Sequence, residues 1–193
     1  MANMYPDVLP KHITSDMSRR AEIEMYNALR AGLSDECDVY YSVAWHHKLN
    51  SSMDGEADFV VLDRRRGLMC IEVKGGKRVW RDSNDGNWYQ ESHGGHTKKL
   101  NRPPLEQARE SRFALREKLA DFLDVAKTKV RICHAVAFPG FDNPNVNMGP
   151  DAHPNLYIFS SHMNNIGSRL DVIWDHFQEN LDLGPMKQET ADK

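Results

Sequence analysis

The chain has 193 residues, of which 40% are hydrophobic and 27% charged, an ordinary composition for a soluble protein of one domain. Its net charge of −3 argues against attachment to nucleic acid by long-range attraction, but it does not exclude a nuclease, because metal-binding carboxylates themselves add negative charge. No apolar stretch approaches membrane-spanning length, no signal-peptide pattern opens the chain, and the three cysteines are widely spaced without a CxxC pair. We therefore expect a cytoplasmic protein with reduced thiols.

The N-terminal part of the chain predicts an irregular arm, a helix and a strand. Residues 1–16 contain prolines and lack a periodic pattern. Apolar residues then recur with a period of 3.6, which predicts a helix that begins at Ser15 or Ser18 and ends near Ala31. The run CDVYYSVAW, residues 37–45, indicates the first strand of a sheet.

The segment GEADFVVLDRRRGLMCIEVKGG, residues 55–76, predicts a β-hairpin, since two apolar runs flank a polar break that ends in glycine. A three-residue loop of residues 65–67 would pair Asp58 with Lys74. Because side chains alternate along a strand, Asp58, Glu72 and Lys74 would then share one face. A two-residue loop would instead place Asp58 on the opposite face from Glu72.

The three charged side chains of this hairpin allow two interpretations. Alternating apolar and charged residues are typical of a half-exposed strand, so the group could be a solvated face with incidental salt bridges. Charged groups beside an apolar strand are costly to bury, however, unless they are paired or hold a metal. The two glycines that end the second strand, Gly75 and Gly76, allow close approach of backbone or substrate and favour a functional site.

Residues 77–101 are expected to form an excursion from the core. A turn signal at residues 84–86 separates two short aromatic segments, which predicts a small hairpin. The aromatic side chains either stack on the bases of bound DNA or pack back on the domain. These aromatic residues are Trp80, Trp88 and Tyr89.

The next part of the chain predicts a second helix and a central strand. Pro103 and Pro104 suit the first turn of a helix, which runs to about Val125. Residues 98–118 are locally basic, and this run is either a solvated helix face or a surface that contacts phosphates. Residues 129–138, KVRICHAVAF, are apolar on both faces, which indicates a strand in the middle of a sheet.

The C-terminal part predicts a short strand at residues 156–160 and an amphipathic closing helix at residues 166–181. The residues that follow are polar. We therefore predict one domain over residues 1–180 and a polar tail or linker over residues 181–193.

The motifs GEADFVV, GLMCIEVKGG and RPPLEQAR, in this order, resemble the nuclease-related domain (NERD), a branch of the PD-(D/E)xK nuclease superfamily. The resemblance extends from about Ser18 to about Gly140 and is closest to the module at the N-terminus of UvrD-like helicase proteins. It implies an α/β fold with an α-β-β-β-α-β core, in which helices flank a mixed sheet. The predicted elements follow this order.

The resemblance also implies a Mg²⁺ or Mn²⁺ site that serves the hydrolysis of DNA. Asp58 and Glu72 are the expected metal ligands, and the carbonyl of Val73 is expected to join them. A glutamate of the first helix would add a ligand or orient a water. Glu22 fits the spacing of NERD-like sequences better than Glu24, which stays the alternative.

Two further residues are assigned roles by the resemblance. Lys74 would position the attacking water or stabilise the charge on the phosphoryl group, and Gln107 would hydrogen-bond a ligand water or a phosphate. RecB-like nucleases carry an aromatic residue four positions after this glutamine, whereas this chain has Ser111, so only Gln107 is carried over.

The expected partners are DNA and a helicase or another DNA-processing protein, in phage defence or DNA processing. The alternative function is a non-catalytic module that keeps the nuclease fold and binds nucleic acid or recruits a partner. The joint presence of Asp58, Glu72 and Lys74 favours the enzyme.

Overall fold

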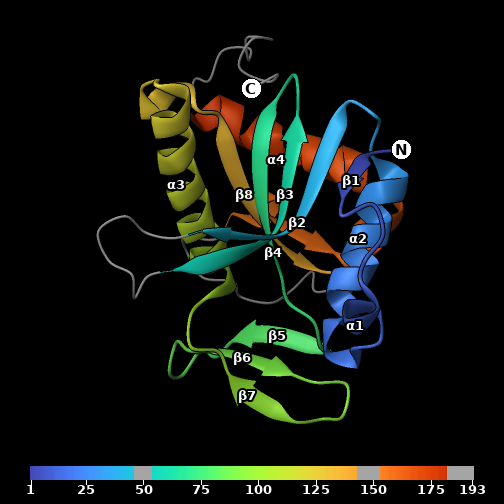
Figure 1. Ribbon diagram of the computed structural model, residues 1–193. Coiled ribbons are helices and arrows are strands. Elements are labelled where there is room, and N and C mark those ends of the chain that lie inside the picture. The colour runs from blue at the N-terminus through green and yellow to red at the C-terminus, as the bar shows by residue number, and fades with distance from the viewer. Residues whose placement is uncertain (46–53, 143–152, 182–193) are drawn as a thin grey trace.

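A six-stranded sheet forms the centre of the domain (Figure 1). The structure is a computed structural model, and it describes residues 1–45, 54–142 and 153–181. The strand order is β1-β2-β3-β4-β8-β9, and the antiparallel strands β2, β3 and β4 are extended by the parallel strands β1 on one side and β8 and β9 on the other. The predicted α/β class with a mixed sheet is therefore confirmed. The strands are β1 (Asn3–Tyr5), β2 (Cys37–Trp45), β3 (Gly55–Asp63), β4 (Gly67–Val73), β8 (Ile132–Phe138) and β9 (Tyr157–Phe159).

Helices cover both faces of this sheet. On one face, α2 (Arg20–Gly32) and α4 (Ile166–Leu181) pack their apolar sides against β3, β4 and β8 and build the main core. On the other face, α3 (Pro104–Leu123) packs over a smaller cluster that includes Val60 and Cys70. The predicted succession of helix, three strands, helix and strand is present as α2, β2–β4, α3 and β8. None of the helices in the described ranges is long and apolar enough to cross a membrane.

The strand β8 lies between β4 and β9, and all seven of its residues are buried. A parallel strand that is covered on both faces needs apolar side chains in both directions, as the run ICHAVAF provides. The prediction of a central strand is therefore confirmed, although the strand begins at Ile132 instead of residue 129. The closing helix at residues 166–181 has the predicted bounds.

The register of the hairpin differs from the prediction by two residues. Asp63 pairs with Gly67, so residues 64–66 form the loop, and the predicted pairing of Asp58 with Lys74 is wrong. The carboxylate of Asp63 accepts hydrogen bonds from the backbone N–H groups of Arg65 (2.8 Å) and Arg66 (3.0 Å), which stabilises the earlier turn. A shift of two residues leaves every side chain on its predicted face.

The N-terminal arm is more ordered than the sequence indicates. Residues 3–5 form β1 at the edge of the sheet, and a short helix, α1 (Lys11–Thr14), follows. The side chains of Met4 and Ile13 are buried, and the hydroxyl of Tyr26 on α2 donates to the backbone carbonyls of residues 6 and 7 at 2.7 Å. The expectation of an irregular arm is therefore wrong over these elements.

The first long helix also begins later than predicted. A 3₁₀ turn, η1 (Met17–Arg19), precedes it, and α2 starts at Arg20. The turn is capped by Asp16, whose carboxylate accepts from the backbone N–H of Ser18 at 2.9 Å. Neither predicted start, Ser15 or Ser18, is therefore the capping residue.

The excursion between β4 and α3 is a separate three-stranded antiparallel sheet (Figure 1), formed by β5 (Arg78–Arg81), β6 (Trp88–Glu91) and β7 (Thr97–Lys99). Trp88 is buried against the core, whereas Trp80 and Tyr89 stack on each other with ring centroids 5.7 Å apart. The guanidinium of Arg78 lies 4.1 Å from the centroid of the Trp80 ring. The predicted hairpin is thus present, with a third strand added. Trp88 packs back on the domain, whereas stacking of Trp80 or Tyr89 on DNA bases stays a prediction.

The predicted boundary at residue 180 stays a prediction. The closing helix extends through residue 181, and the tail expected from there onward lies, from residue 182, outside the described residues.

Replacement of Gly67 by alanine should destabilise the fold by roughly 1–3 kcal/mol. Gly67 has a φ of +109°, and a Cβ there would lie 2.6 Å from the carbonyl oxygen of Arg131. Urea unfolding of the wild type and of Gly67→Ala measures the loss. Gly95→Ala is the matched control, because Gly95 has a φ of +82° with nothing within 4 Å of the added Cβ. Equal losses in the two variants would contradict a role for the contact with Arg131.

Candidate active site

Asp58 lies where the regular pairing of the hairpin ends. The last pair between β3 and β4 is Phe59 with Ile71, and the Oδ2 atom of Asp58 then accepts a hydrogen bond from the backbone N–H of Val73 at 2.6 Å. Across the sheet, Ser42 of β2 has a φ of +60°, and the pairing of β2 with β3 skips this position. The carboxylate of Asp58 therefore takes the place of a backbone acceptor beside the end of β4.

Glu72 and Lys74 stand at the end of β4, next to the first turn of α3. The side chain of Glu72 is buried, and the Nζ atom of Lys74 donates to its Oε1 atom at 2.5 Å. The same Nζ atom donates to Oε1 of Gln107 at 3.2 Å, while Nε2 of Gln107 donates to the carbonyl of Arg102 at 3.1 Å. Because Pro104 begins α3 just before Gln107, the helix places this amide beside the ammonium group.

The two glutamates of α2 have different surroundings. The Oε2 atom of Glu22 accepts from the hydroxyl of Tyr41 at 2.6 Å and from the guanidinium of Arg19 at 3.0 Å. Glu24 instead pairs with Arg20 at 2.9 Å and lines a different pocket. The structure therefore separates the two residues that the sequence left as alternatives.

One cavity of about 310 Å³ brings the predicted side chains together. Glu22 from α2, Asp58 from β3, Glu72 from β4 and Gln107 from α3 all line it. Lys74 joins this group through its bonds to Glu72 and Gln107. Four elements that are distant in sequence thus contribute to one site.

The cavity also has lining residues that the sequence did not single out. Arg19 and Arg102 place two guanidinium groups at its wall, and Glu56 and Glu110 add carboxylates. The spacing of Arg19, three residues before Glu22, is the one signal that could have indicated this ion pair. Arg102 instead arrives at the site through the loop before α3, which no periodic pattern indicates.

Ser111 has a structural role at the edge of the cavity. Its hydroxyl accepts a hydrogen bond from the indole N–H of Trp45 at 3.0 Å and donates to the carbonyl of Glu56 at 3.3 Å. A small buried hydroxyl therefore ties α3 to the ends of β2 and β3. This contact explains why the position accommodates serine in place of an aromatic residue.

Burial dominates the electrostatics of the two central carboxylates. Burial raises the pKa of Asp58 to about 7, with a further upward contribution from Glu72, while the hydrogen bond from Val73 and the charge of Lys74 lower it. Burial also raises the pKa of Glu72, against the opposing attraction of Lys74. The cavity thus holds two acids for which the loss of solvent outweighs the stabilisation that neighbouring groups give to the ionised forms.

This arrangement fits a divalent cation that prefers oxygen ligands and that binds only a few protein groups. Mg²⁺ takes one or two carboxylates and keeps several waters, so Asp58 and Glu72 suffice as a ligand set. A cage of three or more His, Cys, Asp or Glu side chains does not occur among the described residues. Asp58 is partly buried and Glu72 is buried, and the pKa of each is raised; a bound cation would stabilise the ionised forms of both.

The model of the nuclease-related domain family matches residues 18–139, which is more than half of the chain. The match includes all five side chains of the predicted site. No curated protein and no solved structure matches the chain.

The raised pKa of Asp58 predicts a pH-dependent difference in stability between the metal-free wild type and Asp58→Asn. Between pH 4 and 7 the folded wild type keeps a proton on Asp58 that the unfolded chain, with a pKa near 3.8, has lost. The wild type therefore loses stability from this group as the pH rises, and the variant does not. The variant should gain on the order of a few kcal/mol relative to the wild type across this range.

Urea unfolding in EDTA at several pH values measures this difference. Burial lowers the pKa of His134 to about 3, which changes stability in the opposite direction, but His134 is present in both proteins and cancels in the comparison. A difference between the two proteins that does not vary from pH 4 to 7 would show that Asp58 titrates normally.

Proposed function

The chain belongs to the nuclease-related domain family, and from this membership and the geometry of the cavity we propose that it is a Mg²⁺- or Mn²⁺-dependent deoxyribonuclease. The observation that carries the proposal is the convergence of Glu22, Asp58, Glu72 and Gln107 on one cavity, with Lys74 bonded to two of them. The order α2, β2–β4, α3, β8 further supports assignment of the core to the PD-(D/E)xK arrangement.

Asp58 and Glu72 would hold the cation, and we propose the carbonyl of Val73 as an additional ligand. Glu22 would either add a ligand or orient a water. A divalent ion at this place supplies Lewis-acid stabilisation of the charge that develops on the phosphoryl oxygens. The N–H of Val73 fixes the Oδ2 atom of Asp58, so the chain itself orients one carboxylate before any ion binds.

Lys74 provides the fixed positive charge of the site. Its ammonium group is held between Glu72 and Gln107, and the end of β4 restricts its position. In the transition state of phosphodiester cleavage it would donate to a phosphoryl oxygen and stabilise the added negative charge. Gln107 orients the ammonium group, because its own amide is anchored to the carbonyl of Arg102.

Glu22 is the group that we propose to orient the attacking water. Both of its hydrogen bonds, from Tyr41 and Arg19, end on Oε2. The Oε1 atom is then the one that would accept a proton from a water in the cavity. Arg19 and Tyr41 keep the carboxylate in place during this transfer.

We place this activity in DNA processing or phage defence, with a helicase or another DNA-processing protein as the partner. The support is the likeness of the sequence to the module of UvrD-like helicase proteins. The alternative function, a binding or recruiting module without catalysis, predicts a different outcome in the cleavage test below.

Lys74→Ala should lower the rate of DNA cleavage by about 100-fold or more, because the charge that stabilises the transition state is removed. Supercoiled and linear DNA incubated with Mg²⁺ or Mn²⁺ measures the rate. Lys77→Ala is the matched control, since Lys77 is three residues away, exposed, and paired with Glu91 instead of a cavity residue. Tight DNA binding by the wild type without cleavage under either metal would support the binding module and overturn the nuclease proposal.

Mn²⁺ should raise the thermal midpoint of the wild type in a concentration-dependent manner and leave that of Asp58→Asn nearly unchanged. An ion that binds only the folded state stabilises it by about 2.7 kcal/mol at 100 times its dissociation constant. Calorimetry with and without EDTA measures the shift. Glu24→Gln serves as the control, because Glu24 lies outside the cavity and should keep the full response. An equal shift in all three proteins would place the ion elsewhere.

A further inference from the structure

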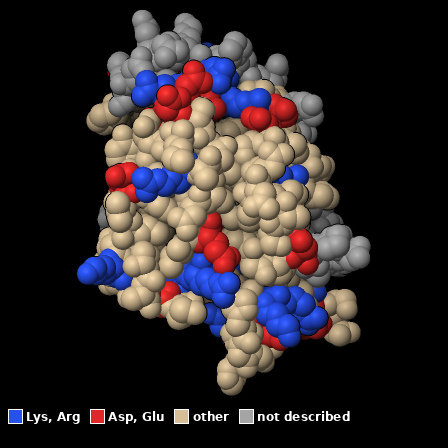
Figure 2. All heavy atoms as spheres, turned by 90° about the vertical axis from the view of Figure 1, so that its right-hand side faces the viewer, with Lys and Arg blue, Asp and Glu red and all other residues tan. Residues whose placement is uncertain are grey.

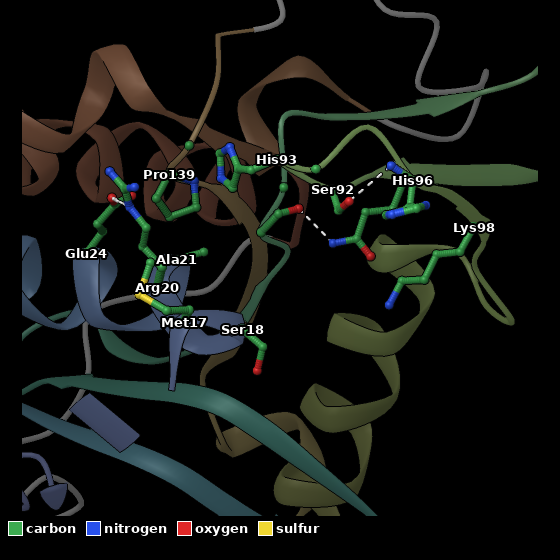
Figure 3. A pocket seen from close by; sticks show the side chains of 15 residues that line it. Met17, Ser18, Arg20, Ala21, Glu24, Ser92, His93, His96, Lys98 and Pro139 are labelled. Atoms are coloured by element: carbon green, nitrogen blue, oxygen red, sulfur yellow. Dashed lines mark hydrogen bonds and ion pairs between the residues drawn. The ribbon is translucent and has the colours of Figure 1, made fainter. Parts of the chain in front are cut away.

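A second and larger pocket lies directly beside the proposed active site. It has a volume of about 660 Å³ and is enclosed by the start of α2, the glycine pair after β4, the β6–β7 hairpin and the turn after β8 (Figure 3). Its size is within the range of pockets that bind small organic ligands. The family match assigns no role to this pocket, and the pocket shares no lining residue with the active-site cavity.

The two cavities share a wall. Arg19 and Glu22 line the active-site cavity, whereas Ser18 and Ala21 of the same helical segment line the second pocket. On β4, the residue that follows Lys74 is Gly75, which lines the second pocket. A chain of nucleotides that places one phosphate beside Lys74 therefore has the second pocket within reach of its neighbouring unit.

The outer wall of the pocket is supplied by the small sheet β5–β7. This sheet is anchored to the core through Val79 and Trp88, which are buried, and through the amide of Gln90, which donates to the carbonyl of Gly75 at 2.7 Å. The cross-strand pairs place Val79, Gln90 and Lys98 on one face of the sheet. Lys98 therefore lies on the pocket side, and the adjacent Lys99 lies on the opposite face beside Tyr89.

The pocket has a basic side. Arg20 is already paired with Glu24 at 2.9 Å, but Lys98 has no carboxylate partner in the described part of the chain. His96 lies near it on the same hairpin, whereas His93 lies beside Pro139 (Figure 3). Figure 2 shows the α2 side of the molecule, with separate groups of Lys and Arg at the height of the small sheet. The positive charge on this side is therefore divided among small groups and does not form one continuous surface.

The opposite side of the pocket carries apolar side chains beside the Arg20–Glu24 ion pair (Figure 3). Ala21, Met17 and Pro139 provide apolar side chains, and the glycines at positions 75 and 140 expose backbone. A Cβ at Gly75 would lie 3.2 Å from the Cβ of Ala21, and one at Gly140 would lie 3.0 Å from the carbonyl of Gly76. The absence of side chains at these glycines therefore lets the segments of this wall pack closely on one another.

We propose that this pocket binds one nucleotide unit of the DNA strand, next to the phosphate that is cut. The base and sugar would lie against the apolar side chains, and the phosphate would be bound by Lys98 with His96. A nucleoside monophosphate combines both chemistries, a flat apolar ring and a dianion, in one molecule of suitable size. The position relative to the cut phosphate rests on the proposed function of the neighbouring cavity, whereas binding of the nucleotide itself does not.

Titration of the full chain with thymidine 5′-monophosphate in EDTA tests the proposal, with binding followed by NMR chemical shifts. The wild type should bind saturably, and Lys98→Gln should bind about tenfold more weakly or worse, because a charged hydrogen bond to phosphate is lost. Lys99→Gln is the matched control, since Lys99 is the next residue on the same exposed strand but faces away, and its affinity should stay within about twofold of the wild type. Thymidine alone and inorganic phosphate alone should each bind more weakly than the nucleotide.

Equal affinities of the two lysine variants, or no saturable binding by the wild type, would overturn the proposal. Lys74→Ala separates this failure from failure of the nuclease proposal. If Lys74→Ala abolishes cleavage but the nucleotide does not bind the wild type, the nuclease stands and the pocket assignment is wrong. If the nucleotide binds through Lys98 but no metal supports cleavage, the pocket stands and the nuclease assignment is wrong. In an active enzyme, Lys98→Gln should raise KM and leave kcat nearly unchanged.

Discussion

Two acids line one cavity, Asp58 partly buried and Glu72 buried, and the cost of removing their charges from water is the constraint on which the site depends. Burial raises the pKa of both, and the surrounding chain offsets only part of this cost. The N–H of Val73 stabilises one carboxylate, and the ammonium of Lys74 stabilises the other. A fold that keeps two carboxylic acids in this state has a reason beyond stability, because apolar residues of similar size would pack there at lower cost. A bound cation would remove the remaining imbalance, which connects the electrostatics of the cavity with the chemistry of a nuclease.

The scaffold holds this pair through elements that are rigid for independent reasons. The strands β4 and β8 pair along six residues within the core, and all but the first residue of this stretch of β4 are buried. The turn at residues 64–66 sets the register of β3 on β4, and hence the position of Asp58 opposite the end of β4. Both flanking helices then bring polar side chains to the cavity, among them Glu22 from α2 and Gln107 from α3. Side chains from helices on opposite faces of the sheet can reach the same cavity only where the sheet ends.

The small sheet β5–β7 adds a second cavity without adding to the central sheet. This sheet is inserted directly after the glycine pair that follows β4. Its first strand, β5, therefore begins only a few residues after Lys74. The positive φ of Gly76, +99°, lets the chain turn into this sheet, and its N-terminal neighbour Gly75 accepts the hydrogen bond that fastens Gln90. The same two glycines therefore follow the strand that carries Glu72 and line the neighbouring pocket. Under the two proposals, this shared boundary makes the two cavities parts of one substrate path.

Alternation along β3 and β4, combined with the expected three-residue loop, predicted from the sequence that Asp58 and Glu72 share a face. Apolar runs predicted the central strand β8 and the closing helix α4. These features depend on local periodicity, which the sequence contains. The register of the hairpin was decided instead by the bonds of Asp63 to the turn, and the strand β7, with its sequence TKK, exists because β6 offers it a partner. The choice of Glu22 over Glu24 as a lining residue of the active-site cavity, and the arrival of Arg102 there, followed from the way helices and loops pack around the sheet. Such contacts join residues that are far apart in the chain, so only the tertiary structure could decide them.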